Sequence, residues 1–351
     1  MIFTREMGFP MPPNGKSGWP WTDPVSITQD DLKICSGLKI SIVTPSYNQG
    51  QFIEETIRSV LLQNYDNFEY IIIDGKSTDN SLEIIQKYQN YLSYWVSEPD
   101  RGQTHAINKG LAIATGDIVA YLNSDDIYLP GTFKKIINFF QNNPDIDMLY
   151  GDLVHIDKQS KVIDVMCCDM LDRNKMFSFH YYFPQASVFF RKEMLEKIGL
   201  FDESLHLNMD YDYWMRLSFE GKMAHIPQTL ACARLYPEAK SQFFAQGYMH
   251  ENLGILNKYK EKIKQLNDSD SLLSHAYASV YYYGGLSYLR NGKFSLGLKN
   301  IQTAIGYKKS IILDPVLFYS LICGIFGEKR VNNLVCAILR NIGHTSLIYH
   351  R

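Results

Sequence analysis

The sequence has few cysteines and almost no net charge. Six cysteines stand at irregular spacing among 351 residues, and no two form a CxxC pair. This pattern excludes a disulfide scaffold and a cysteine-based zinc site, and it is typical of proteins from a reducing cytoplasm. The 35 lysines and arginines nearly balance the 37 aspartates and glutamates, which gives a net charge of −2. We therefore expect no general electrostatic binding of nucleic acid.

Long apolar runs are also missing. The first residues, MIFTREMGFPMPP, have no continuous apolar core of the kind that a signal peptide needs. The most apolar late stretch, residues 311–326, contains Asp314 and Pro315 and is too short and interrupted for a membrane span. We expect a cytoplasmic protein. A further option is that a helical tail places it in peripheral contact with the inner face of a membrane.

Two nucleotide-binding loops and a histidine metal site are absent as well. The loop after the first predicted strand is TPSYNQG rather than GxGxxG, and no GxxxxGK[ST] loop occurs in the chain. These absences argue against dinucleotide binding and against a P-loop. Five histidines lack the spacing of metal ligands: His105, His155, His180, His206 and His225.

The chain does contain an alternation of strands and helices. Residues 1–38 hold five prolines without a hydrophobic period, which predicts an extended arm that Trp19 and Trp21 pin to the globular body. From Lys39 onward, apolar runs alternate with helical periods, which predicts a doubly wound, mostly parallel sheet. The predicted strands are 39–44, 68–74, 94–96 and 117–122, and the predicted helices are 51–63, one beginning near residue 82, and 103–114.

Beyond residue 143 the pattern changes. A hairpin is predicted from residues 148–157 and 161–168, with its turn at Lys158, Gln159 and Ser160. The following predictions are a strand at 185–191, helices at 193–198, 208–221, 245–265, 269–291 and 294–307, and shorter helices to the end. The predicted domains are the arm 1–38, an α/β domain 39–241 and a helical extension 242–351.

Acidic side chains stand where predicted strands end or helices begin. Asp125 and Asp126 lie side by side in YLNSDDIYLPG, and Asp74 follows the second strand. Asp210 and Asp212 begin the helix at 208–221. Each acid alone has an ordinary interpretation as a turn or helix-cap residue. Together at one sheet edge they suit sugar transfer from a nucleotide diphosphate, in which carboxylates hold the ribose, hold a divalent ion and accept the acceptor's proton.

Four stretches between about Lys39 and Ser241 stand out: VTPSYNQGQFIEETIRSVLLQ, YIIIDGKSTDNS, EPDRGQTHAINKGLAIATGDIVAYLNSDD and MDYDYWMRL. They occur in the order found in the inverting glycosyltransferases of family 2. Through them the chain resembles that family, and the resemblance implies the GT-A fold, a nucleoside-diphosphate sugar as donor and Mg²⁺ or Mn²⁺ as cofactor. It also implies roles at matched positions: the nucleobase pocket for Thr44, Pro45 and Tyr47, nucleotide contact for Asp74, donor binding for Asp100, Gln103, Lys109, Asn123, Ser124 and Asp125, metal binding for Asp125 and Asp126, and the catalytic base for Asp210.

The chain departs from that family in four places. Gly75 stands where many relatives have a second Asp, which leaves the nucleobase and hence the donor open. Asn123 replaces the first Asp of DxD, so a metal would depend on Asp125 and Asp126. Tyr236 stands where relatives commonly have a histidine near the diphosphate, and a phenol is a poor neutral ligand. The QxxRW motif of processive members is missing, which favours one sugar per encounter.

The sequence therefore predicts an inverting glycosyltransferase of the hexosyltransferase type that acts in polysaccharide or glycolipid biosynthesis. It would move a sugar from a nucleoside-diphosphate sugar to a hydroxyl of a sugar, glycolipid or polysaccharide acceptor. One alternative is another nucleotide-sugar enzyme, such as a nucleotidyltransferase, which predicts a glycine- and lysine/arginine-rich triphosphate loop that the sequence does not show. The other is a catalytically silent nucleotide-sugar-binding or scaffold protein, against which donor hydrolysis would count.

Overall fold

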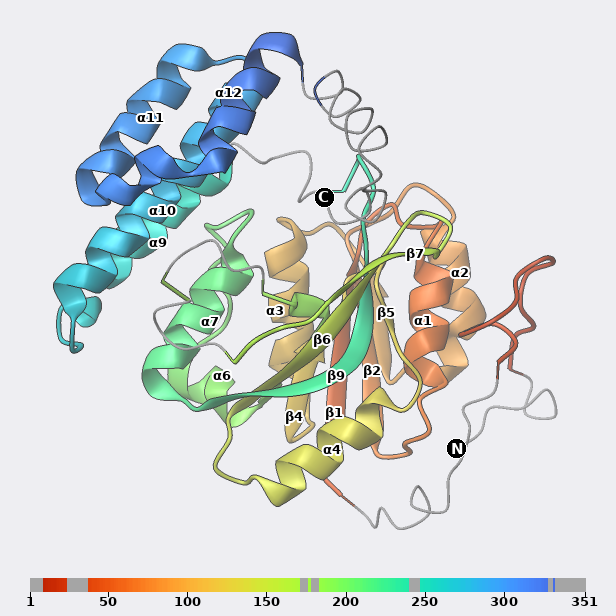
Figure 1. Ribbon diagram of the computed structural model, residues 1–351. Coiled ribbons are helices and arrows are strands. Elements are labelled where there is room, and N and C mark those ends of the chain that lie inside the picture. Colours follow the sequence, from red (N-terminus) through yellow and green to blue (C-terminus); the bar gives the residue numbers. More distant parts are fainter. Residues whose placement is uncertain are drawn as a thin grey trace. The chain divides into compact units, whose positions relative to one another are not determined.

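The computed structural model describes residues 9–23, 37–170, 176–177, 183–239, 247–327 and 331. The chain forms two compact units, one from residues 1–170 and 183–236 and the other from residues 171–182 and 237–351. The first unit contains the sheet, and the second is helical in its described residues (Figure 1). The domain boundaries at residues 38 and 241 stay predictions.

A nine-stranded sheet forms the first unit, and its four leading strands are parallel. Their order is β3 (Tyr94–Ser97), β2 (Phe68–Asp74), β1 (Ile40–Ser46) and β4 (Ile118–Tyr121). β1 and β4 are wholly buried and rich in isoleucine and valine, as expected of strands that helices cover on both faces. The predicted parallel arrangement is confirmed. Because β4 lies on the other side of β1 from β2, the strand order reverses between β1 and β4, which is where open α/β sheets bind ligands.

Helices pack on both faces of these parallel strands. Three of them, α1 (Ile53–Leu61), α2 (Ser81–Tyr88) and α4 (Thr132–Asn142), bury their apolar sides in one core with alternate residues of β1, β2 and β4. α3 (Gln103–Ile113) packs on the opposite face, where a Cβ at Gly110 would lie 2.3 Å from the Val43 side chain. The missing side chain at Gly110 thus lets α3 approach β1 closely.

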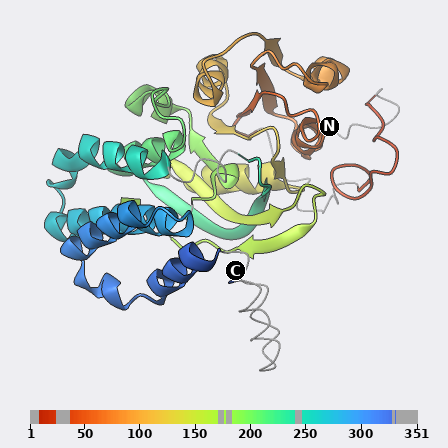
Figure 2. The same cartoon turned by 90° about the horizontal axis from the view of Figure 1, so that it is seen from above.

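The remaining strands form a mixed part of the sheet. β8 (Val188–Arg191) is antiparallel to both β4 and β6 (Met148–Ile156), and β9 (Met223–Arg234) runs parallel to β6. The predicted hairpin is confirmed, since β7 (Val162–Met166) pairs antiparallel with β6. Figure 2 shows the two long strands, β6 and β9, from above.

Three details differ from the expectation. β5 (Ile127–Tyr128) is a two-residue strand, too short to show an alternation in sequence, and it pairs antiparallel with β9. Although a proline is favoured in the first turn of a helix, Pro130 precedes α4, and Gly131 at φ +75° stands directly before the helix. Residues 185–187 form a 3-10 turn, η4 (Gln185–Ser187), rather than the start of a strand. Through β5, the segment that carries Asp125 and Asp126 is tied to the end of β9.

An aromatic cluster fixes the position of helix α7 in this unit. α6 (Glu193–Ile198) precedes α7 (Met209–Glu220) in the chain. Tyr213 and Trp214 on α7 are fully buried, and the Tyr213 ring stacks on Phe201 with 4.2 Å between centroids. Leu217 is buried as well. The burial of these side chains fixes which side of α7 remains for Asp210.

The described part of the N-terminal arm is attached to the sheet unit. The Trp19 indole Nε1 donates to the Tyr128 carbonyl at 2.8 Å. The Arg58 guanidinium of α1 donates to the Pro20 and Trp21 carbonyls and lies 5.4 Å from the centre of the Trp21 ring. The tryptophans pin the arm, as expected, while residues 1–8 and 24–36 lie outside the described residues.

The described residues of the second unit form helices α9 (Gly247–Ile263), α10 (Ser269–Arg290), α11 (Phe294–Tyr307) and α12 (Pro315–Phe326), with a short 3-10 turn, η5 (Lys309–Leu313), before α12. The first unit has a similar short turn, η3 (Gln89–Tyr91), after α2. α10 and α11 approach closely where Gly285 faces Gly297, since a Cβ on either would lie 3.1 Å from the other's carbonyl oxygen. The short helices predicted after residue 327 fall almost entirely outside the described residues. No helix in the described ranges is long and apolar enough to cross a membrane.

Candidate active site at the end of the parallel strands

The segment after β4 turns sharply, and it sends its two carboxylates in different directions. The Asp126 amide donates to the Asn123 carbonyl at 3.1 Å, which closes the turn. The Asp126 carboxylate is buried, and its Oδ1 accepts from the Arg234 backbone amide at 2.9 Å. The Thr56 hydroxyl of α1 donates to the Asp126 carbonyl at 2.7 Å. Hydrogen bonds to its carboxylate and to its carbonyl oxygen therefore hold Asp126 in place.

Asp125 presents its carboxylate to a single phenol. The Tyr236 hydroxyl donates to Asp125 Oδ2 at 2.8 Å, and the Gln49 amide lies 3.5 Å from the same hydroxyl. Burial raises the pKa of Asp125, although the Tyr236 hydrogen bond works against the shift. Burial and the Asp125 carboxylate raise the pKa of Asp126 to about 8. Burial and the Asp125 charge also raise the pKa of Tyr236, so its phenol remains a donor at neutral pH.

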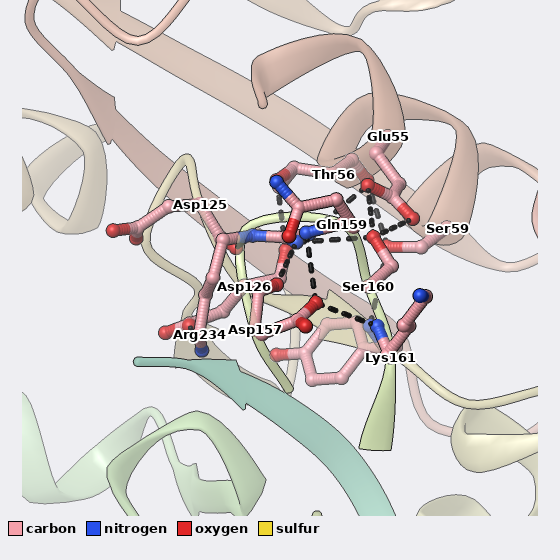
Figure 3. A network of polar contacts seen from close by, with 11 residues as sticks. Glu55, Thr56, Ser59, Asp125, Asp126, Asp157, Gln159, Ser160, Lys161 and Arg234 are labelled. Carbon is pink, nitrogen blue, oxygen red and sulfur yellow. Dashed lines mark hydrogen bonds and ion pairs between the residues drawn. The ribbon is translucent and has the colours of Figure 1, made fainter. Parts of the chain in front are cut away.

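A buried ion pair supports this turn (Figure 3). The Arg234 guanidinium at the end of β9 is fully buried and pairs with Glu55 of α1, with 3.0 Å between Nη2 and Oε2. Its Nε donates to the Asp125 carbonyl at 2.9 Å, and its Nη1 donates to the Asp157 carbonyl at 2.8 Å. Arg234 thus contacts α1, the Asp125 turn and the β6–β7 hairpin at once. We call Glu55, Arg234, Asp157 and Ser160 the Arg234 network.

Asn123 links this turn to α3. Its side-chain oxygen accepts from Gln103 Nε2 at 2.7 Å, and its nitrogen donates to Gln185 Oε1 at 3.2 Å and to Asp126 Oδ2 at 3.3 Å. Gln185 in turn donates to the Tyr121 carbonyl at 2.9 Å. The amide of Asn123 supplies both a donor and an acceptor here, which an aspartate could not do. Two predicted donor-binding residues, Asn123 and Gln103, are therefore in direct contact, and Ser124 beside them is buried.

The edge formed by β1 and β2 carries three more predicted residues. The Thr44 hydroxyl accepts from the buried Tyr70 phenol at 3.1 Å, so Thr44 faces the core, and Pro45 is buried in β1. Tyr47 is 60% exposed in the loop that follows. The predicted nucleobase contact thus rests on Tyr47 and on the loop backbone rather than on the Thr44 side chain.

Asp74 is fully buried at the end of β2. Its carboxylate accepts from the Ser77 amide at 2.9 Å and from the Ser77 and Ser97 hydroxyls at 2.5 and 2.6 Å. Direct contact between Asp74 and a nucleotide, which stays a prediction, would require these bonds to open. Asp100 lies nearer the surface, where a Cβ at Gly75 would come 2.6 Å from its carboxylate. The missing side chain at Gly75 is what admits the Asp100 carboxylate to this edge.

Lys109 and Asp210 complete the predicted set. Lys109 on α3 forms an ion pair with Glu98, so its charge is already compensated. Asp210 is half-buried in the first turn of α7, and its Oδ1 accepts from the Tyr211 amide at 2.8 Å. Its neighbour Met209 accepts from the Thr104 hydroxyl through sulfur at 3.1 Å. Since Thr104 follows Gln103 in α3, the first turn of α3 connects Asp210 with Asn123.

Asp212 has a different place on the same helix. Its side chain is fully buried, and Oδ2 accepts from Arg216 Nε at 2.9 Å. Arg216 also donates to the Ile198 and Leu200 carbonyls, which ties α7 to the segment after α6. Asp212 therefore holds the helix in place, and the half-buried Asp210 is the more exposed acid of the two.

The donor set at the turn fits a divalent cation only through Asp125. Among the described residues, no three His, Cys, Asp or Glu side chains gather closely enough to hold a metal ion by themselves. Mg²⁺ in nucleotide sites commonly takes one or two carboxylates and completes its shell with water and phosphate oxygens. Asp125 suits that role, whereas both carboxylate oxygens of Asp126 already accept hydrogen bonds, Oδ1 from the Arg234 amide and Oδ2 from the Asn123 side chain. The geometry favours Asp125 as a ligand, and metal binding by the pair stays a prediction.

Several residues of the site were not expected from the sequence. Asn123, Asp125 and Asp126 are held in place from other parts of the chain, by Glu55, Thr56, Gln185 and Arg234.

Two buried polar atoms near the end of β1, Ser46 Oγ and Gln49 Oε1, have no hydrogen-bond partner among the described residues. A buried polar atom without a partner is costly, so these two indicate a polar ligand at this edge. The loop SYNQG was the sequence signal that could have pointed to them.

Comparison with known sequences gives a consistent set of relatives. Residues 41–199 match the model of Glycosyl transferase family 2. An uncharacterized glycosyltransferase of Nostoc sp. is 28% identical over 57% of this chain and 65% of the relative. One of Methanocaldococcus jannaschii is 29% identical over 50% and 63%, and one of Rickettsia prowazekii is 26% identical over 80% and 91%. The chain thus spans just under two thirds of the first two relatives.

Two solved structures share the fold. TarS of S. aureus, residues 1–349 in complex with UDP-GlcNAc, matches with a TM-score of 0.52 and 19% identity over 79% of this chain and 92% of TarS. The mannosyltransferase PcManGT of Pyrobaculum calidifontis, in complex with GDP-Man and Mn²⁺, matches with a TM-score of 0.51 and 14% identity over 89% and 92%. The predicted GT-A fold, a mostly parallel sheet followed by C-terminal helices, is confirmed.

Proposed function

We propose that the chain, whose residues 41–199 match the model of Glycosyl transferase family 2, is an inverting glycosyltransferase of that family. It would move a sugar from a nucleoside-diphosphate sugar to an acceptor hydroxyl. One observation carries the proposal. The Asp125 carboxylate stands at the reversal of strand order and is oriented by one phenol, whereas the acids beside it, Asp126 and Glu55, are engaged by Arg234.

The roles of the residues follow from where they stand. Asp125 would hold Mg²⁺ or Mn²⁺, and the bound ion would supply positive charge that stabilises the leaving diphosphate. Asp210, half-buried at the start of α7, would accept the proton of the acceptor hydroxyl. The acceptor oxygen would attack the anomeric carbon from the face opposite the leaving group, and a single displacement of this kind inverts that centre.

The nucleotide would lie over the loop that follows β1. The exposed Tyr47 ring offers a stacking surface for a base. Ser46 Oγ and Gln49 Oε1, which are unpartnered within the described residues, offer polar contacts for ribose or phosphate oxygens. The related structures hold UDP-GlcNAc and GDP-Man, so uridine and guanosine diphosphates are the first donors to test.

The acceptor is a further part of the proposal. Side chains of the helical unit around α12 are apolar and exposed, among them Leu313, Phe318 and Ile325. A patch of this kind is typical of contact with lipid or with another protein. It supports an acceptor hydroxyl on a glycolipid or polysaccharide, with the helical unit in peripheral contact with a membrane. Cytoplasmic placement and transfer of a hexose belong to the same proposal.

A binding experiment tests the proposed function. UDP, GDP, CDP and ADP are titrated calorimetrically into the wild type and Asp125→Ala, with Mn²⁺ and with chelator. We expect the wild type to bind one of them more tightly with Mn²⁺, and Asp125→Ala to bind it more weakly and without cation dependence. Asp145→Ala, an exposed acid in the loop after α4, is the matched control and should behave as the wild type.

The outcomes separate the alternatives. Binding and turnover in the wild type that ignore chelator would refute the metal role, and Asp125 would then bind donor hydroxyls directly. Failure of the wild type to bind any of the four diphosphates would contradict the proposed function itself. Release of free sugar from the matching nucleotide sugar, and its loss in Asp210→Asn, would exclude a catalytically silent binding protein.

A further inference from the structure

The turn of the β6–β7 hairpin is a fixed structure. Asp157 Oδ1 accepts from the Gln159 amide at 2.8 Å and from the Lys161 amide at 2.9 Å. Ser160 adopts φ +62°, a left-handed conformation that most side chains avoid. Its hydroxyl donates to the Glu55 carboxylate at 2.8–2.9 Å. The turn therefore has one conformation, set by its own backbone and by α1.

The Arg234 network holds this turn against the segment that carries Asp125. Arg234 Nη1 donates to the Asp157 carbonyl at 2.8 Å and to the Ser160 hydroxyl at 3.0 Å. Its Nε donates to the Asp125 carbonyl at 2.9 Å. One fully buried guanidinium thus fixes the distance between the hairpin turn and Asp125 (Figure 3). The residues of the hairpin turn are consequently held beside the candidate active site.

The turn carries Lys158, whose ammonium lies over the ring of Tyr236, the residue that donates to Asp125. Lys158 Nζ lies over the Tyr236 ring, 5.6 Å from its centroid, and the hydroxyl of the same ring donates to Asp125. The side chain of Tyr236 therefore contacts both the ammonium and the carboxylate. We infer that Lys158 is a phosphate-binding residue that contacts the diphosphate of the nucleotide sugar. The inference rests on the proposed function and assigns to this site a residue from outside the four family motifs.

Charge balance supports this role. Asp125 carries a carboxylate here, and a nucleoside diphosphate brings further negative charge to the same place. Arg234 cannot reach a ligand, because it is fully buried and donates to Glu55 and to three acceptors besides. Lys158 is exposed, and a lysine ammonium is a compact charge suited to phosphate oxygens.

The test measures diphosphate binding by calorimetry in variants of the full chain. UDP and GDP are titrated into the wild type, Lys158→Ala, Lys158→Arg and Lys161→Ala at low and at high salt. Lys158→Ala should weaken binding of the preferred diphosphate by about tenfold to a hundredfold, with a larger loss at low salt. Lys158→Arg should restore most of the affinity because it keeps the charge.

The matched control is Lys161→Ala, which removes the same charge from the same turn. It should bind the diphosphate as the wild type does, since no contact of the Lys161 side chain with Tyr236 or Asp125 occurs in the described structure. The thermal midpoints of all four proteins should agree, because Lys158 and Lys161 are exposed. Equal loss in both alanine variants would show a general charge effect and would overturn the inference.

Two failures are distinguishable. If the wild type binds a diphosphate and Lys158→Ala binds it equally well, Lys158 has no such role and the proposed function is untouched. If the wild type binds neither UDP nor GDP, nor the other two diphosphates of the panel above, both proposals are contradicted. Weaker binding in Lys158→Ala that arginine does not restore would also count against a charge-based contact.

Discussion

Replacing Arg234 by methionine should lower the free energy of unfolding of the sheet unit by about 3–5 kcal/mol. The Arg234 guanidinium is fully buried, and its partner Glu55 is 6% exposed. Removing one partner of such a pair leaves a buried carboxylate without its counter-charge, and the Asp125 and Asp157 carbonyls lose their donor as well. Methionine keeps an extended apolar side chain, so the loss reports the polar contacts rather than a cavity.

The assay is urea denaturation followed by tryptophan fluorescence. All four tryptophans, Trp19, Trp21, Trp95 and Trp214, belong to the sheet unit, so the transition reports that unit alone. The midpoint should fall while the slope with denaturant stays constant, because the surface exposed on unfolding hardly changes.

A double variant sharpens this experiment. Arg234→Met with Glu55→Leu removes both charges, so the buried carboxylate no longer lacks a partner. The double variant should be less destabilised than the sum of the two single variants, with a coupling of roughly 1–3 kcal/mol. A loss below about 1 kcal/mol in Arg234→Met, or full additivity of the two changes, would refute the reasoning.

Two further predictions concern catalysis and acid stability. Asp210→Asn should leave donor binding intact and slow sugar transfer by roughly two to four orders of magnitude, while Asp212→Asn should lower the thermal midpoint through loss of the Arg216 pair and slow transfer much less. The reverse pattern in single-turnover assays would reassign the base. Burial works to raise the pKa of Glu69, but hydrogen bonds from Lys39, Ser41 and Thr115 lower it to about 2. Because this folded-state pKa lies below the unfolded value, the stabilisation is present above about pH 4.5 and is lost as the pH falls toward 2. Glu69→Gln should therefore cost up to about 3 kcal/mol at pH 7 and almost nothing at pH 2 in urea titrations, and a pH-independent difference would contradict this account.

The secondary structure of the sheet unit could be predicted because its signals are local. The runs KISIVT, FEYIIID and DIVAYL are apolar and β-branched, and they are bounded by turn residues, so each strand can be recognised within a few residues. The hairpin at Lys158 to Ser160 was predictable for the same reason. β5 was not, because two residues are too few to show alternation and its pairing with β9 depends on residues about a hundred positions away.

The contacts within the site depend on distant residues, which a single sequence does not reveal. Arg234 follows Asp126 by 108 positions and Glu55 by 179. Asp125 and Asp126 are neighbours of the same residue type, and only the surrounding packing decides that Asp126 turns toward Arg234 and Asp125 toward Tyr236. The resemblance to a family located the acidic segment. It could not show which carboxylate remains for a ligand, because that depends on the contacts of Asp126 with Arg234 and of Asp125 with Tyr236.

The cost of the Arg234 network gives a reason to connect it with catalysis. Buried ion pairs contribute little net stability compared with well-packed apolar residues, so stability alone does not account for Glu55 and Arg234. The network joins α1, β9, the hairpin turn and the Asp125 segment, which are far apart in sequence. Charges that meet a leaving diphosphate act best when they are fixed before the donor arrives, since no energy is then spent on moving them. A guanidinium that holds Asp125 on one side and the turn of Lys158 on the other provides this fixed arrangement, and the Arg234→Met variant should accordingly lose donor affinity as well as stability.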